Sequence, residues 1–237
     1  MANDILSLDR LTKRFGKKCA LEDVSFSISG GRIVGLLGPN GSGKTTLIKL
    51  ANGLLHPDGG AVYIDGQRPS EKTKAIVSYL PDRMYVADWM KVSDLVRMFA
   101  DFYQDFDKEK AFSMLRSLDI SEADRMKTMS KGTKEKVQLV LVMSREAMLY
   151  LLDEPIGGVD PAARDFILRT ILTNYSPESA VLISTHLISD VEKVLDEVIF
   201  LKEGRLIRHE NVDHIREQEG KSVDQLFREI FAIGTEG

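Results

Sequence analysis

The feature that most constrains this fold is a glycine-rich segment set between an apolar run and a helical pattern. Residues 38–45 read GPNGSGKT and match the pattern G-x-x-x-x-G-K-[ST]. The apolar run 32–37 precedes the segment, and residues 44–52 have the spacing of a helix that stops at Gly53. A buried strand, a glycine loop and a helix in this order predict a loop whose backbone N–H groups close around phosphate.

The residue types of this loop suit a highly negative triphosphate. Glycine permits the dihedral angles and the close approach that such a loop needs, and the N-terminus of the following helix adds partial positive charge. The Lys44 ammonium would reach the β- and γ-phosphates, and the Thr45 hydroxyl would bind Mg²⁺. A glycine-rich turn that ends in lysine by chance is the alternative, and the flanking elements argue against it. We therefore predict a site for ATP and Mg²⁺ made by Gly38, Pro39, Asn40, Gly41, Ser42, Gly43, Lys44, Thr45 and Thr46.

Composition limits the other classes of function. The chain has 237 residues, a net charge of −4 and one cysteine, Cys19, so no intrachain disulfide forms. With that charge there is no general attraction to nucleic acid, and no nucleic-acid partner is expected. No stretch approaches the roughly 18 apolar residues of a membrane-spanning helix. We expect a soluble chain that reaches a membrane only through a partner.

Strand-like and helix-like runs alternate along the chain. Strand character lies at 5–12, 20–29, 32–37, 61–65, 75–80, 149–152, 180–184, 197–201 and 205–208. Helical spacing lies at 44–52, 92–118, 132–147, 161–174 and 187–195. Because strands separated by helices form parallel sheets covered by helices, we predict an α/β fold with a mainly parallel sheet. A helical insert at about 85–143 interrupts it.

Polar groups at two strand ends complete the predicted site. The apolar run 148–152 ends in Asp153 and Glu154, and a strand buried on both faces favours such an end where a cation sits at its carboxyl edge. Asp153 suits a Mg²⁺ ligand, and Glu154 a general base for the attacking water. His186 follows the strand at 180–184, where it could meet the γ-phosphate. A solvated acid pair and a structural histidine are the alternatives.

These elements in this order resemble the ATP-binding cassette (ABC) family, specifically its nucleotide-binding subunit, over about residues 5–208. The resemblance implies a P-loop NTPase core with an N-terminal antiparallel β subdomain and an inserted α-helical subdomain. It also implies a signature stretch of Leu-Ser-Gly-Gly-Gln type, matched here by residues 129–133, MSKGT. Ser130 and Gly132 match, whereas Met129, Lys131 and Thr133 depart from the pattern. A plain serine N-cap is the alternative for Ser130.

In that family the signature acts in trans. The resemblance implies that two cassettes pack head to tail and clamp each ATP between the phosphate loop of one and the signature of the other, here Ser130, Lys131, Gly132 and Thr133. Asp160 matches the loop that communicates across this interface. As a bare sequence, residues 157–161 form a turn in which Asp160 caps a helix beginning at Pro161.

The resemblance assigns two further residues to the nucleotide and its metal ion. Phe15 matches the aromatic residue that stacks on adenine, and an ordinary edge phenylalanine is the alternative. Asp82 stands where a glutamine ligand to Mg²⁺ is usual, a change that resembles a subtype of exporters. The residues after it would face the membrane subunit or pack within the helical part: Met84, Tyr85, Trp89 and Met90.

The same resemblance divides the chain into four parts. Residues 1–84 form the first part of the ATP-binding core with its β subdomain, and 85–143 the helical insert with the signature. Residues 144–210 complete the core, and 211–237 form a helical tail in which Val223, Leu226, Phe227 and Ile230 could make one apolar stripe.

The function implied is that of an ATPase that powers a separate membrane permease, resembling bacterial type-2 exporters. Its partners would be the permease and a second ABC ATPase subunit, in a homodimer or a heterodimer, and its place would be the cytoplasm, peripheral on the inner face of the cell membrane. A soluble ABC ATPase acting in assembly, such as iron–sulfur assembly, is the alternative. A small-molecule kinase with the same loop is disfavoured by the set of Asp153, Glu154, Ser130 and His186.

Overall fold

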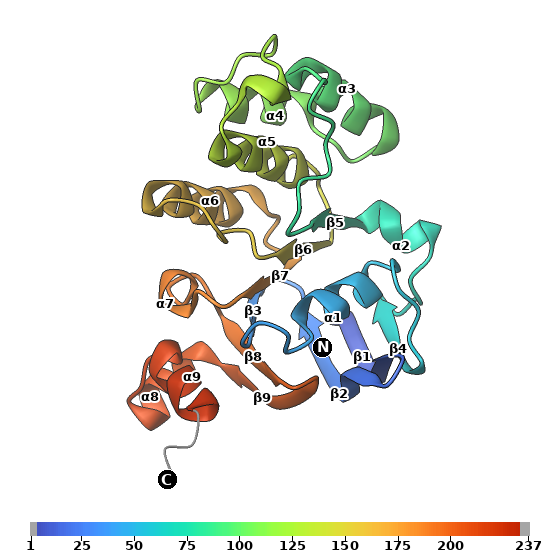
Figure 1. Ribbon diagram of the computed structural model, residues 1–237, viewed down its shortest axis with the longest axis vertical. Helices are drawn as coiled ribbons and strands as arrows, with labels where there is room; N and C mark the ends of the chain where they lie inside the picture. Colours follow the sequence, from blue (N-terminus) through green and yellow to red (C-terminus); the bar gives the residue numbers. More distant parts are fainter. Residues whose placement is uncertain (1–3, 233–237) are drawn as a thin grey trace.

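A computed structural model describes residues 4–232 and is organised around a six-stranded sheet (Figure 1). Its strand order is β5-β6-β7-β3-β8-β9, and all neighbours are parallel except the antiparallel pair β8–β9. The strands are β3 (Ile33–Leu37), β5 (Val77–Leu80), β6 (Leu149–Asp153), β7 (Ala180–Thr185), β8 (Glu197–Lys202) and β9 (Arg205–Asn211). The predicted α/β class with a mainly parallel sheet is confirmed.

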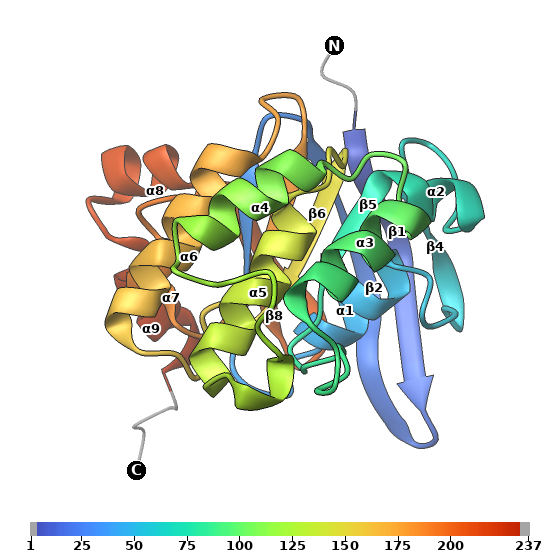
Figure 2. The same ribbon diagram turned by 90° about the horizontal axis from the view of Figure 1, so that it is seen from above.

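A smaller sheet lies on one face of the large one. It has the order β2-β1-β4, with both pairs antiparallel, and consists of β1 (Asp4–Phe15), β2 (Lys18–Ser29) and β4 (Gly59–Ile64). The hairpin of β1 and β2 runs along one side of the molecule in Figure 2. It is the antiparallel β unit that the resemblance implied.

Alternate residues of the large sheet pack into two different cores. In β6, Leu149 and Leu151 join the cluster shared with the small sheet and α1 (Lys44–Ala51), whereas Tyr150 and Leu152 join the opposite cluster. Successive strand side chains point to opposite faces, so a strand between two apolar layers must be apolar throughout. This is why the central strands appear in the sequence as unbroken apolar runs.

Within residues 4–232, five helices cover the opposite face. They are α5 (Lys131–Met143), α6 (Pro161–Asn174), α7 (Ile188–Val191), α8 (Val212–Glu219) and α9 (Val223–Phe231). The predicted stripe of the tail is confirmed, since Val223 and Leu226 are buried in this core and Phe227 and Ile230 pack against it. The ends of the predicted first part and tail, residues 1–3 and 233–237, lie outside the described residues.

A helical lobe with its own core stands at one end of the molecule (Figure 1). It contains α3 (Val92–Phe102), α4 (Lys108–Arg116), the 3₁₀ turn η1 (Met126–Thr128) and one side of α5. Leu139 and Val142 of α5 face the sheet core, whereas Val137 and Leu141 face the lobe core. Helix α5 therefore belongs to both bodies.

Arg145 fastens the base of this lobe to the sheet. Its buried guanidinium donates to both carboxylate oxygens of Asp105, with Nε 3.0 Å from Oδ1, and to the backbone carbonyls of Ala75 and Val77. It also stacks 3.8 Å from the centroid of the Tyr103 ring. A planar, five-donor cation suits this many partners.

Several predicted boundaries were wrong; the helix predicted over 132–147, for example, ends at Met143. The helical pattern over 92–118 is two helices, because the chain turns at 103–107 and Asp107 caps α4 by accepting from Lys110 N. The strand predicted over 75–80 covers only 77–80, since Ser70 caps a short helix, α2 (Glu71–Ile76). The helix predicted over 187–195 is α7 alone.

No helix within residues 4–232 combines the length and the apolar character needed to cross a membrane.

Candidate functional site

The glycine loop joins β3 to α1 with little room for side chains. Gly43, the residue before α1, has φ of 112°, and a Cβ there would lie 2.6 Å from the Ala20 carbonyl oxygen. A Cβ on Gly38 would lie 2.3 Å from the Leu201 carbonyl oxygen. Only glycine fits at these two positions. The loop is therefore held by β2 and β8, and its open side faces a cavity of about 630 Å³ lined by Asn40, Gly41, Lys44, Thr45 and Thr46 among others.

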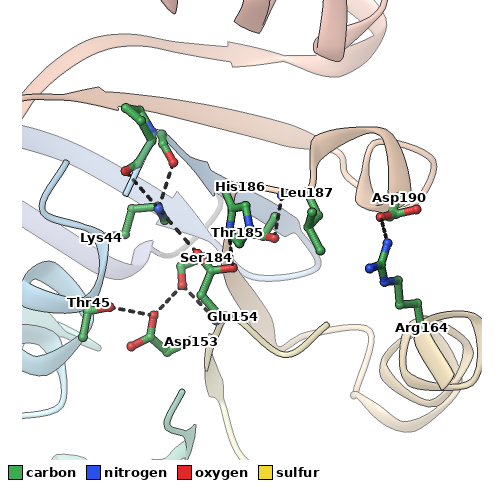
Figure 3. Close-up of polar contacts among 12 residues, drawn as sticks. Lys44, Thr45, Asp153, Glu154, Arg164, Ser184, Thr185, His186, Leu187 and Asp190 are labelled. Carbon is green, nitrogen blue, oxygen red and sulfur yellow. Dashed lines mark hydrogen bonds and ion pairs between the residues drawn. The ribbon is translucent and has the colours of Figure 1, made fainter. Parts of the chain in front are cut away.

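Lys44 lies at the centre of the site (Figure 3). Its ammonium donates to the carbonyls of Gly38, at 2.8 Å, and Pro39, at 3.3 Å, and lies 3.5 Å from Glu154 Oε1. The side chain is only 6% exposed. A cation so placed joins the loop to the carboxylate at the end of β6.

Asp153 meets the loop from β6. Its Oδ1 accepts from the Thr45 hydroxyl at 3.1 Å and from the Ser184 hydroxyl at 2.6 Å. Its Oδ2 is buried and has no hydrogen-bond partner among residues 4–232. Burial raises the pKa of Asp153, the hydrogen bonds from Ser184 and Thr45 lower it, and the charges of Asp82 and Glu154 raise it. A buried, unpartnered carboxylate oxygen beside Thr45 fits a bound cation.

Ser184 was missed as an individual site residue in the sequence. It lies opposite Asp153 in the parallel pairing of β6 and β7, and its hydroxyl also accepts from Glu154 N at 3.1 Å. Only the pairing register of β6 and β7 places Ser184 opposite Asp153, and that register cannot be read from the sequence.

Glu154 and His186 come together across the ends of β6 and β7. His186 Nδ1 lies 3.0 Å from Glu154 Oε2, so one carboxylate oxygen contacts the imidazole and the other faces Lys44 (Figure 3). Glu154 has φ of 50°, a left-handed backbone that strains a residue with a Cβ. Its amide donates to the Ser184 carbonyl at 3.0 Å, which fixes that conformation.

Phe15 and Asp82 lie on the same cavity as the phosphate loop. Phe15, which is 49% exposed, ends β1, and Asp82 follows β5. Asp82, Glu154, Gly157 and Lys131 also line an adjoining cavity of about 520 Å³, which reaches Asp153. The sheet edge thus gathers acidic side chains next to a phosphate-type loop.

The stretch 130–133 begins α5. Ser130 Oγ accepts from Thr133 N at 3.2 Å and lies 2.8 Å from Thr133 Oγ1, the geometry of an N-cap. Lys131 lines the cavity of its own phosphate loop; Ser130, Gly132 and Thr133 are not among the described residues that do. The structure therefore separates Lys131 from the rest of the predicted signature.

Asp160 caps α6, as its sequence context predicted. Its Oδ1 accepts from Ala163 N at 3.0 Å, and this backbone hydrogen bond lowers the pKa of the carboxyl group.

Comparison with known proteins assigns the chain. The sequence pattern of the family described as ABC transporter matches residues 21–157. The chain belongs to the ABC transporter family. Within it, the chain is an ATP-binding subunit, and membership implies ATP hydrolysis. The resemblance drawn from the sequence motifs is confirmed.

Relatives of this ABC subunit include ATP-binding proteins of Bacillus subtilis (strain 168). The ABC transporter ATP-binding protein YtrB is 30% identical over 90% of this chain and 74% of its own. The SkfA peptide export ATP-binding protein SkfE is 30% identical over 90% of this chain and 92% of its own. A solved structure, described as the ATP binding subunit of an ABC transporter, superposes with a TM-score of 0.86 at 30% identity, covering 95% of this chain and 99% of the other.

Proposed function

We propose that this ABC subunit hydrolyses Mg²⁺-bound ATP and thereby powers a separate membrane permease, an exporter. The contact set Lys44–Glu154–His186, made at the ends of two parallel strands against a phosphate loop, carries the proposal. Peptide export in the printed name of SkfE supports the direction of transport.

The chain's own residues divide the work of hydrolysis. The loop amides and Lys44 hold the phosphates, and Glu154 accepts a proton from the attacking water. His186 fixes the Glu154 carboxylate from the other side. Asp153 and Thr45, with Asp82 beside them, would hold Mg²⁺, which when bound would offset charge on the phosphate oxygens. Such a site needs only one or two carboxylates, because phosphate oxygens and water supply the other ligands.

The residues Ser130, Gly132 and Thr133 support a role on a second subunit. They begin α5 away from the lining of their own phosphate-loop cavity, so they are free to meet the nucleotide of another cassette. A helix N-terminus with a serine hydroxyl suits a phosphate. We propose an ATP-dependent dimer, with Asp160 near its interface.

An exposed aromatic surface supports permease docking at the cytoplasmic face of the membrane. A cavity of about 370 Å³ between β5 and the lobe is lined by Leu54, Tyr85, Phe99 and Tyr103 among others. Of these, Leu54 and Tyr85 are exposed and Phe99 is buried. Trp89, next along the chain, is 68% exposed. Exposed aromatic residues in one region mark protein contacts.

The Glu154→Gln variant tests the function. We expect it to bind ATP and to form a dimer in sedimentation experiments with Mg²⁺ and ATP. Turnover should fall by about 100-fold or more, because glutamine keeps the shape of the side chain but cannot accept a proton from water. Glu109→Gln is the control, because Glu109 is an exposed acid on α4 in the helical lobe and is not among the described residues that line either cavity at the phosphate loop. Full turnover in Glu154→Gln, or a strict monomer at saturating ATP, would contradict the proposal.

A further inference from the structure

The cavities at the phosphate loop hold more acidic groups than an anion site needs. Asp82 and Glu154 line both cavities, and Asp153 lines the second. A nucleotide brings further negative charge to the same place. Cations on these walls therefore decide whether ATP binds well.

Lys44 is already engaged by neighbours on three sides. It donates to the Gly38 and Pro39 carbonyls and pairs with Glu154. Lys18 lines only the phosphate-loop cavity, at the end that holds Phe15. A second cation beside Asp82 and Glu154 would offset charge that Lys44 cannot offset alone.

Three further cations line the second cavity, Arg83, Lys131 and Lys134, and Lys134 pairs with Asp88 at 2.6 Å. Among the described residues, Lys131 is the cation that lines both cavities. Its side chain lines both cavities together with Asp82 and Glu154. Its ammonium reaches the turn after β6, since a Cβ placed on Gly158 would lie 3.1 Å from Lys131 Nζ.

The Lys131 head group is also free to move toward a ligand. Its described ion pair is to Glu135, one helical turn on, at 3.6 Å, and the side chain is 75% exposed. The Glu135 side chain is 21% exposed, so only the lysine end of this i,i+4 pair lies in solvent. Such pairs on a helix contribute little to stability. A phosphate group is a stronger acceptor for the ammonium than this carboxylate contact.

We infer that Lys131 binds the nucleotide phosphates of its own subunit, in cis, and offsets the charge that Asp82 adds to the site. This rests on the proposed ATP site but does not require the dimer. Asp82 and Lys131 lie far apart in sequence, and they place opposite charges on the wall of the same cavity.

The test is nucleotide affinity of the monomer. Binding of a non-hydrolysable ATP analogue with Mg²⁺ is measured by calorimetry, at a concentration where sedimentation shows one subunit only. We expect Lys131→Ala to weaken binding by about three- to ten-fold, as loss of one charge-assisted contact predicts. Lys131→Arg keeps affinity within about two-fold. In Asp82→Gln, removal of Lys131 has a smaller effect, because less negative charge is left to offset.

Lys127→Ala is the matched control. Lys127 is exposed in η1, close in sequence, and is not among the described residues that line either cavity, so the net charge changes equally without a change at the site. Equal affinity of Lys131→Ala and wild type in the monomer would overturn the inference, and so would a loss that appears only in the dimer. If wild type and Lys44→Ala both fail to bind, the proposed function fails. If only Lys44→Ala fails and Lys131→Ala binds normally, the cis role alone fails.

Discussion

At the scale of single residues, Arg145 is a buried side chain outside the site with several hydrogen-bond acceptors. It satisfies Asp105 and two backbone carbonyls while buried, so its removal leaves a carboxylate and two acceptors without a donor. We expect Arg145→Ala to lower the free energy of unfolding by about 3 kcal/mol and Arg145→Lys by about 2 kcal/mol, because lysine cannot form the fork.

Urea denaturation measures both changes. Arg169→Lys is the control, since Arg169 is exposed on α6 and its replacement should stay within about 0.5 kcal/mol. A loss below about 1 kcal/mol in Arg145→Ala would show that the lobe is held mainly by its apolar core.

The sequence predicted residues that carry a motif and missed those defined by spatial pairing. Thr45 follows from the loop motif and Asp153 from the acidic end of an apolar strand, and the structure joins them by a hydrogen bond. Ser184 and Arg145 have no motif, because their partners are set by strand register and by a chain turn far away in sequence. Local spacing cannot encode such partners.

At the scale of elements, the stability of α6 depends on pH through its N-cap residue, Asp160. Its carboxylate caps the helix and its pKa is lowered from 3.8 by the backbone hydrogen bond. A lowered folded pKa means that the stabilisation is present above pH 3.8 and is lost as pH falls through the lower folded value. We expect Asp160→Ala to lower the melting temperature by about 2 °C at pH 7, with the difference from wild type shrinking below pH 3.8.

Thermal melting followed by circular dichroism from pH 3 to pH 7 measures this effect. Asp165→Ala, exposed on the same helix, should show neither the loss nor its pH dependence. A difference from wild type that stayed constant down to pH 3 would mean that the carboxylate charge does not stabilise the cap.

Element types were predicted well where burial sets the pattern, and boundaries less well. Strands β3, β6 and β7 stand out because both faces are apolar. The break between α3 and α4 is concealed, since the apolar residues Tyr103 and Phe106 continue the helical pattern while packing on Phe99. Apolar spacing reports burial, and it does not report which backbone geometry achieves it.

At the scale of the whole molecule, the lone tryptophan is a reporter of docking. The chain has one Trp, Trp89, exposed between β5 and α3. We expect the emission of the isolated subunit to be that of a hydrated indole and to change little with ATP. Binding to permease-containing vesicles should shift it to shorter wavelength as the indole is buried.

Trp89→Phe is the control, because it should abolish the signal while leaving ATP turnover in solution unchanged. Unshifted emission from vesicles whose permease stimulates ATP turnover would exclude Trp89 from the docking surface.

The left-handed backbone of Glu154 has a consequence for how such a chain can change over time. A residue with a Cβ in this conformation costs roughly 1 kcal/mol, and glycine there would relieve that strain. Laboratory selection for heat resistance alone would weigh this strain against the loss of the Lys44 and His186 contacts, and glycine at 154 would erase the carboxylate. Robustness and turnover are in conflict at this one position, so a thermostable derivative of this protein should be checked for activity before anything else.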